Sequence, residues 1–287
     1  MFIQPNVLEN NHTRPGADRF FNGHGAYIDT LNVQLNLTEN TSVLGGKFAP
    51  SFGTAWDVAP GIYGTDFAED YELSEQLGFA IGHNFGTDSI GTILLTGNIF
   101  TADTTFMSNS VGAVRGRAEK IDGGAGNTEE LNNYSVTLDL GDIKSVEGLS
   151  VHLGYRHLAK GVDSSNAENG YVAGFVYETH LSEELSAALT GEFTHLSHAG
   201  GGADDQNFFT AGVSFGYGQW HLDVAGTQRN TDVAGGADVK DELFQISLGY
   251  TDAYETDWNI GYKFSEEGGV DTEFFGVFVT KTFGFEG

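Results

Sequence analysis

The chain has 287 residues, enough for one large all-β domain or two ordinary ones. Its 40 Asp and Glu against 13 Lys and Arg give a formal net charge of −27, which argues against nucleic-acid binding by phosphate neutralisation. The absence of cysteine excludes disulfides, thiolate chemistry and cysteine zinc sites.

Alternation of apolar and polar residues predicts strands along nearly the whole chain. Residues 1–9 read as a poor first strand, no run approaches the length of a membrane-spanning helix, and no signal peptide is visible. Thirteen clearer runs follow: 26–38, 41–49, 73–86, 91–105, 131–141, 148–159, 170–181, 185–197, 206–218, 220–230, 241–251, 256–265 and 272–285. Their usual length of about 9–11 residues suits tilted strands that cross a bilayer.

The two faces of these runs differ in composition. One face is apolar and aromatic, and the opposite face is mostly small and polar, as with Ser186, Thr190 and Thr194 against Leu185, Leu189 and Phe193. A soluble sandwich usually carries long charged side chains on its outer face, whereas small polar residues suit a water-filled lumen. The pattern favours a barrel, with a soluble or surface-exposed β-sheet protein, such as an adhesin, as the alternative.

The connections between the runs alternate in length. Short turns such as "TENT", "SEE" and "GQ" alternate with longer, glycine-rich and acidic segments such as "SHAGGGADDQ" and "NTDVAGGADVK". Transmembrane barrels show this asymmetry because their two rims face different compartments. The sequence therefore predicts one domain over residues 1–287, a transmembrane antiparallel β-barrel of 14 to 16 strands. Short turns would be periplasmic, and 103–127 would be a long external loop.

Two segments resemble a known family. The closing "VFVTKTFGF", with Phe283 and Phe285, resembles the C-terminal assembly strand of Gram-negative outer-membrane proteins. The stretch "GKFAPSFGTAWDVAPGIYGTDFAEDYELSEQLGFAIGHNFG" is similar to a strand, long loop and strand of a general-diffusion porin, whose third external loop narrows the channel. In sixteen-stranded porins this loop follows the fifth strand, which implies that the N-terminal strands and signal peptide are missing here.

The resemblance also implies a location and a function. It predicts an outer-membrane homotrimer, in contact with lipid and lipopolysaccharide, that passes small hydrophilic solutes and ions by passive diffusion. The excess of carboxylates predicts a preference for cations.

Charged residues suggest how such a channel would be narrowed. Asp57, Asp66, Glu69 and Asp70 lie in the candidate constriction loop 50–72, whose alternative is to stay outside the barrel. Strand parity places three cations on inward faces, where they would form a basic wall opposite the acids or stand scattered at different heights: Arg156, Arg229 and Lys263.

The remaining polar motifs carry weaker signals. His195, Ser197 and His198 at a strand end leave an outer-membrane hydrolase as a third reading, although no partner acid can be assigned. We expect no cofactor and no catalysis. Loose divalent-cation binding by the glycine–aspartate loops, bridging to lipopolysaccharide, is a further expectation.

Overall fold

The computed structural model describes residues 2–9, 24–112 and 115–282, and it consists of one antiparallel sheet of 14 strands. The thirteen clear runs are strands, and the weak N-terminal run is a fourteenth. Their bounds are β1 Phe2–Glu9, β2 His24–Asn36, β3 Thr41–Phe48, β4 Gln76–Asn84, β5 Thr92–Ala102, β6 Asn133–Gly141, β7 Leu149–Leu158, β8 Glu168–His180, β9 Leu185–Ser197, β10 Asp205–Tyr217, β11 Trp220–Asp232, β12 Val239–Thr251, β13 Thr256–Glu267 and β14 Val270–Lys281.

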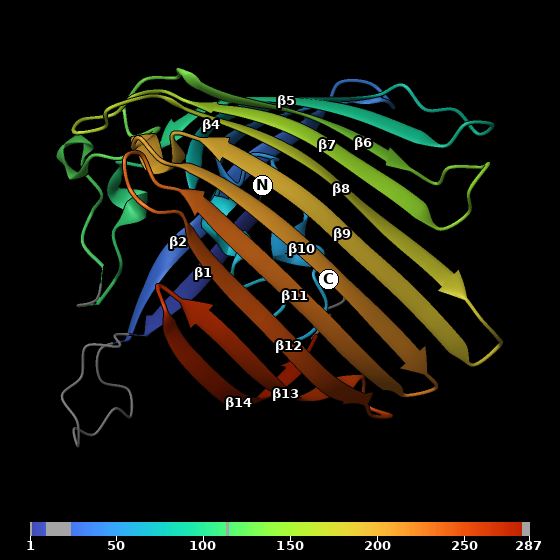
Figure 1. The fold of residues 1–287 in the computed structure, drawn as a ribbon. Helices are drawn as coiled ribbons and strands as arrows, with labels where there is room; N and C mark the ends of the chain where they lie inside the picture. The colour runs from blue at the N-terminus through green and yellow to red at the C-terminus, as the bar shows by residue number, and fades with distance from the viewer. Residues whose placement is uncertain (1, 10–23, 113–114, 283–287) are drawn as a thin grey trace.

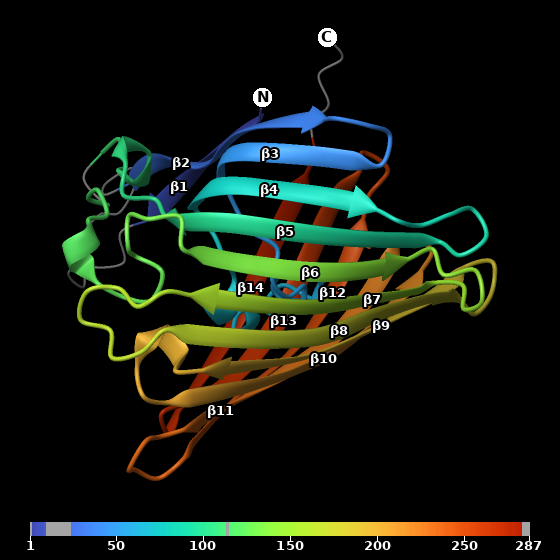
Figure 2. The ribbon, with the colours of Figure 1, turned by 90° about the horizontal axis from the view of Figure 1, so that it is seen from above.

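Each strand pairs with its neighbour in sequence, and the sheet curves around an interior (Figures 1 and 2). This order follows from the short connections, because neighbouring antiparallel strands can be joined by tight turns. No helix in the described part of the chain is long and apolar enough to cross a membrane. The structure confirms the predicted all-β, antiparallel fold, and the sheet curves as in a barrel, with no pairing between β1 and β14 among the described residues.

The long connections contain the few helical turns. These are α1 Ala55–Val58 and the 3-10 turns η1 Ala68–Tyr71, η2 Phe106–Ser108, η3 Lys120–Asp122 and η4 Ala199–Gly201. The connection left between the predicted runs 256–265 and 272–285 is shorter in the structure than in the prediction. Strands β13 and β14 pair as far as Glu267 and Val270 and leave a two-residue turn. Gly268 and Gly269 both have positive φ there, as tight hairpin turns require.

The sheet is apolar on its outside and polar on its inside. Large apolar side chains on the outer face are open to the surroundings, with exposed fractions of 53% for Ile81, 57% for Ile260 and 73% for Val277. Inward-pointing residues of the strands are polar and buried, such as Asn259 beside Ile260 on β13 and Thr190 on β9. A soluble barrel would have the reverse arrangement. The outer face is therefore suited to lipid.

Aromatic side chains gather near both ends of this outer face. Near the long loops, the Tyr155 ring lies 6.1 Å from that of Tyr134 and 5.1 Å from that of Tyr171. Near the short turns, the rings of Trp220 and Tyr250 lie 4.8 Å apart. Amphipathic rings at these two levels match the interfaces of a bilayer, where aromatic girdles form.

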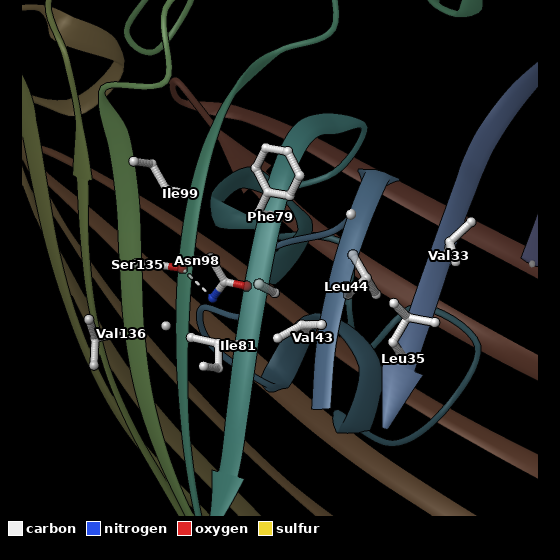
Figure 3. Close-up of a pocket in the computed structure, with 13 residues that line it drawn as sticks. Val33, Leu35, Val43, Leu44, Phe79, Ile81, Asn98, Ile99, Ser135 and Val136 are labelled. Atoms are coloured by element: carbon white, nitrogen blue, oxygen red, sulfur yellow. Dashed lines mark hydrogen bonds between the residues drawn. The ribbon is translucent and has the colours of Figure 1, made fainter. Parts of the chain in front are cut away.

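A hollow of about 650 Å³ interrupts the outer face over β2–β6 (Figure 3). It exists because two outward positions, Gly45 and Gly97, carry no side chain. Apolar residues rim it, and Asn98 on its floor donates a 2.9 Å hydrogen bond to Ser135. The rim comprises Val33, Leu35, Val43, Phe79, Ile81, Ile99 and Val136.

Candidate pore constriction

Residues 50–72, which we call the lumen loop, lie against the polar inner face of the sheet. The hydroxyl of Ser51 lies 3.0 Å from that of Thr137 on β6. At the far side, the amide of Gln245 on β12 donates to the carbonyl of Pro60 at 2.8 Å. Between these points, the N–H of Gly53 donates to Nε2 of His152 on β7 at 3.2 Å. The loop therefore runs along the inner face of the sheet, from β6 and β7 to β12.

A small apolar core fastens the loop to β5, β8, β9 and β10. The ring of Tyr71 lies 5.0 Å from that of Phe208, edge to face. Such aromatic pairs add to the free energy gained by removing apolar surface from water. The cluster is Phe52, Ala55, Ala59, Ala68, Tyr71 and Leu73 with Phe100, Val172, Leu196 and Phe208 from the strands. This core fills one side of the interior with protein.

Arg156 on β7 lies beneath the loop and is 3% exposed. It forms an ion pair with Glu168 on β8 at 2.6 Å and donates to the carbonyl of Tyr71 at 2.5 Å. Its guanidinium also lies 4.5 Å from the ring centre of Phe52. Arginine suits this site because its planar fork serves several acceptors and stacks on an aromatic face.

The other two wall cations bind loop carboxylates directly. Lys263 on β13 contacts Asp66 at 2.5 Å. Arg229 on β11 pairs with Asp70 and, at 2.8 Å, with Asp241 on β12. Each cation also lies close to an aromatic ring of the loop, Tyr63 beside Lys263 and Phe67 beside Arg229. All three wall cations thus lie in the halves of their strands that lead toward the end of the sheet with the long connections, and each contacts the lumen loop.

The arrangement differs from two charged walls that face each other across water. Asp66 and Asp70 neutralise their cations at contact distance. Asp57 and Glu69 are exposed on the loop, without an ion pair among the described residues. The facing inner wall of β2–β4 is neutral, with inward positions such as Asn32, Gln34 and Ser42. The free charge of the constriction is therefore negative.

Two buried charged residues, one at the lumen loop and one at the end of β3, were not singled out from the sequence. Glu192 on β9 is 6% exposed and accepts hydrogen bonds from the loop. Lys47, which is fully buried, pairs with Glu75 at 2.7 Å and with Asp103 at 2.9 Å. Arg115 pairs with the same Glu75 at 2.6 Å. Because Asp103 and Arg115 belong to the external loop 103–127, this buried network fastens that loop to the end of β3.

No protein-family model and no curated protein matches the sequence. Solved structures do resemble the chain. The outer-membrane expressed OmpT of Vibrio cholerae matches 85% of this chain and 73% of its own, with TM-score 0.50 and 11% identity. Pseudomonas aeruginosa OpdQ matches 84% and 63%, with TM-score 0.51 and 11% identity. The outer membrane channel DcaP of Acinetobacter baumannii matches 90% and 78%, with TM-score 0.50 and 10% identity.

The chain has a porin-like outer-membrane β-barrel fold. These likenesses, together with the apolar exterior, agree with the fold inferred from alternation and loop lengths. Phe283 and Phe285, the aromatic residues of the expected assembly strand, lie outside the described residues, whereas the preceding part of that strand is β14.

In this porin-like barrel, one loop carboxyl is set to respond to pH. Burial raises the pKa of Glu72 above its ordinary value, and the nearby carboxylate of Glu69 raises it further. The folded protein therefore binds this proton more tightly than the unfolded chain does. As the pH falls, Glu72 is protonated at a higher pH than an ordinary glutamate. This protonation stabilises the folded protein relative to the unfolded chain and removes a negative charge from the loop.

We therefore expect the negative charge of the lumen loop to begin to decline at a higher pH than free glutamate would give. Reversal potentials in a salt gradient, recorded between pH 8 and pH 4, measure this. Glu72→Gln should remove the early part of the decline. Identical pH curves for this variant and the wild type would contradict the assignment.

His195 and Ser197 of the hydrolase reading lie on the outer face of the sheet, at the end that carries the long loops. His195 shares the outward face with Tyr171 and Asn207, and its Nδ1 lies 2.9 Å from the amide oxygen of Asn207. The hydroxyl of Ser197 donates to the carbonyl of Asn169 at 3.5 Å. Among the residues that the structure describes, no group of three or more His, Asp or Glu side chains could hold a metal ion.

Proposed function

We propose that the protein is a porin-like channel of the Gram-negative outer membrane through which small hydrophilic solutes and ions diffuse passively. The carrying observation is the reversed sheet, apolar toward the surroundings and polar toward the interior, with the lumen loop fastened inside. Lipid covers the apolar outer face, and water and solutes occupy the polar interior beside the loop. The proposed function contains no catalytic step.

We further propose that this channel prefers cations. The wall cations are neutralised by carboxylates: Arg156 by Glu168, Arg229 by Asp70 and Asp241, and Lys263 by Asp66. The carboxylates of Asp57 and Glu69 face the open side of the loop without such partners among the described residues. Fixed negative charge beside a narrow, water-filled passage attracts cations and repels anions.

Planar-bilayer recordings test both statements. We expect discrete single-channel steps, and in a salt gradient a reversal potential of the sign that cation flow produces. The double variant Asp57→Asn with Glu69→Gln should move that potential toward zero. Lys263→Met should make the reversal potential larger, because it leaves the negative charge of Asp66 without its cation. No conductance would refute the channel, and an anion-selective potential would refute the charge assignment alone.

We propose that the barrel assembles as a homotrimer through the outer face of β2–β6. The hollow at Gly45 and Gly97 supports this, because helices and sheets associate in lipid through close shape complementarity rather than through apolar surface alone. In the same recordings, a trimer gives conductance steps in groups of three. Lipid and lipopolysaccharide would cover the remaining outer face, with divalent cations loosely held by the acidic external loops.

The soluble or adhesin reading finds no support in the fold. It requires the aromatic faces of the strands to pack inward, but these faces point outward, as Phe175, Phe244 and Trp258 do with exposed fractions of 38%, 45% and 50%. The hydrolase reading would need a histidine that is paired with an acid and free to act on a substrate. His152 on β7 does lie 2.6 Å from Asp139, but its other ring nitrogen, Nε2, accepts the N–H of Gly53 in the lumen loop. His195 bonds instead to the amide of Asn207, so we assign no catalytic role to it.

A further inference from the structure

A single carboxylate contacts both ends of the lumen loop. Glu192 projects from the middle of β9 into the interior, where one of its oxygens accepts the N–H and the hydroxyl of Thr54 at 2.7 and 2.9 Å. The other oxygen accepts the N–H of Ala55 at 3.2 Å and the hydroxyl of Tyr71 at 2.7 Å. Residues 54 and 71 are thereby held at one point of the wall.

This site requires a carboxylate. All four groups that face it are N–H or O–H donors, and an ionised carboxylate is the only side chain with acceptor capacity on both oxygens and no donor. Glu192 has no described cation partner, so these donors are what satisfies its buried charge. Hydrogen bonds to an ionised acceptor are stronger than those between neutral groups, and an unpaired buried charge is costly.

The surroundings are shaped around this contact. Gly174, the neighbour of Glu192 on β8, leaves room for the side chain, since a Cβ there would lie 2.9 Å from its carboxylate oxygen. Gly53 has a φ of +72°, and a Cβ there would lie 2.8 Å from the ring of Tyr71. Burial and the Glu192 carboxylate also raise the pKa of Tyr71, which keeps its hydroxyl a donor.

We propose that Glu192 is a positioning residue that holds the two ends of the lumen loop together and against the inner wall. It thereby fixes the width of the passage. This inference rests on the proposed channel function only for its effect on conductance. The position of the loop is independent of transport, because it follows from hydrogen bonds that exist whether or not solute passes. A loop released at both ends would open more often and sample several positions.

The test compares Glu192→Gln with wild type in two measurements. Glutamine has the same size but turns an N–H toward two of the four donors. We expect chymotrypsin cleavage within residues 54–71 of the folded barrel to accelerate by roughly ten-fold or more, since cleavage follows the population of the opened loop and charged hydrogen bonds contribute at least that factor. In bilayers, the single conductance level should split into several fluctuating levels.

Thr190→Val is the matched control, because Thr190 points inward from the same strand without a described bond to the loop. Tyr71→Phe and Thr54→Ala remove donors from the loop side and serve if Glu192→Gln does not fold. Slow cleavage and a single conductance level in the folded variants would overturn the proposal. A wild-type barrel without conductance, but with cleavage accelerated by Glu192→Gln, would instead refute the channel and retain the role of Glu192.

Discussion

Replacing Ile81 with arginine should destabilise the monomeric barrel, in which lipid covers the proposed trimer face, by about 2–4 kcal/mol, the usual cost of a charged side chain at the bilayer midplane on the lipid face of an outer-membrane strand. Ile81 lies near the middle of β4, its side chain is 53% exposed and it points outward between Val43 and Gly97. Water cannot solvate the guanidinium there without deforming the bilayer. Urea unfolding in lipid vesicles, followed by the altered gel mobility of the unheated folded form, measures the change.

Gly82→Arg, at the adjacent residue, is the matched control. Gly82 points inward, and a Cβ there would meet its nearest neighbour, Leu94, at an ordinary 3.5 Å. The long side chain can therefore reach the water of the interior, and we expect a stability change below about 1 kcal/mol together with a weaker cation preference. Equal destabilisation by both variants would contradict the expected difference between the two faces, and a larger loss in Gly82→Arg would show that the faces have been assigned the wrong way round.

The strands could be predicted from sequence because one physical rule governs them. Side chains alternate between lipid and interior, so the period of two survives in nearly every strand, from His24–Asn36 to Val270–Lys281. The turn at Gly268 and Gly269 was missed because its flanking Glu266 and Glu267 look like loop residues. Strands of a barrel extend beyond the bilayer, where both faces meet water and the alternation no longer distinguishes strand from loop.

The site could be predicted only in part, because parity gives the face of a residue and not the path of a loop. It placed Arg229 and Lys263 on the inner wall, but it could not show that each binds a loop acid. Lys263 and Asp66 are 197 residues apart in sequence, and their contact depends on how the loop crosses the interior. Glu192 looked like one more polar lumen residue. Lys47 did carry a signal, since a lysine on an outward-facing position needs buried partners.

The buried ion pair of Arg156 and Glu168 is expected to make a large contribution to the stability of the barrel. Arg156→Met should destabilise the folded barrel by about 3–5 kcal/mol, because it leaves the carboxylate of Glu168, 3% exposed, without its cation. The same change removes the hydrogen bond to the Tyr71 carbonyl and the stacking on Phe52, so the lumen loop loses a second anchor. The stability of Arg156→Lys should fall between that of the wild type and that of Arg156→Met, since lysine keeps the positive charge but not the planar guanidinium.

The double variant Arg156→Met with Glu168→Gln separates the cost of an unpaired charge from the cost of lost packing. Replacing both partners of a buried ion pair with neutral groups is often close to neutral, so we expect the double variant to recover most of the lost stability. Glu168 also accepts the N–H of Gly200 at 2.7 Å, a contact that a glutamine oxygen can keep. If the double variant is as unstable as Arg156→Met, then Arg156 stabilises the barrel mainly through Tyr71 and Phe52, by holding the loop rather than by balancing charge.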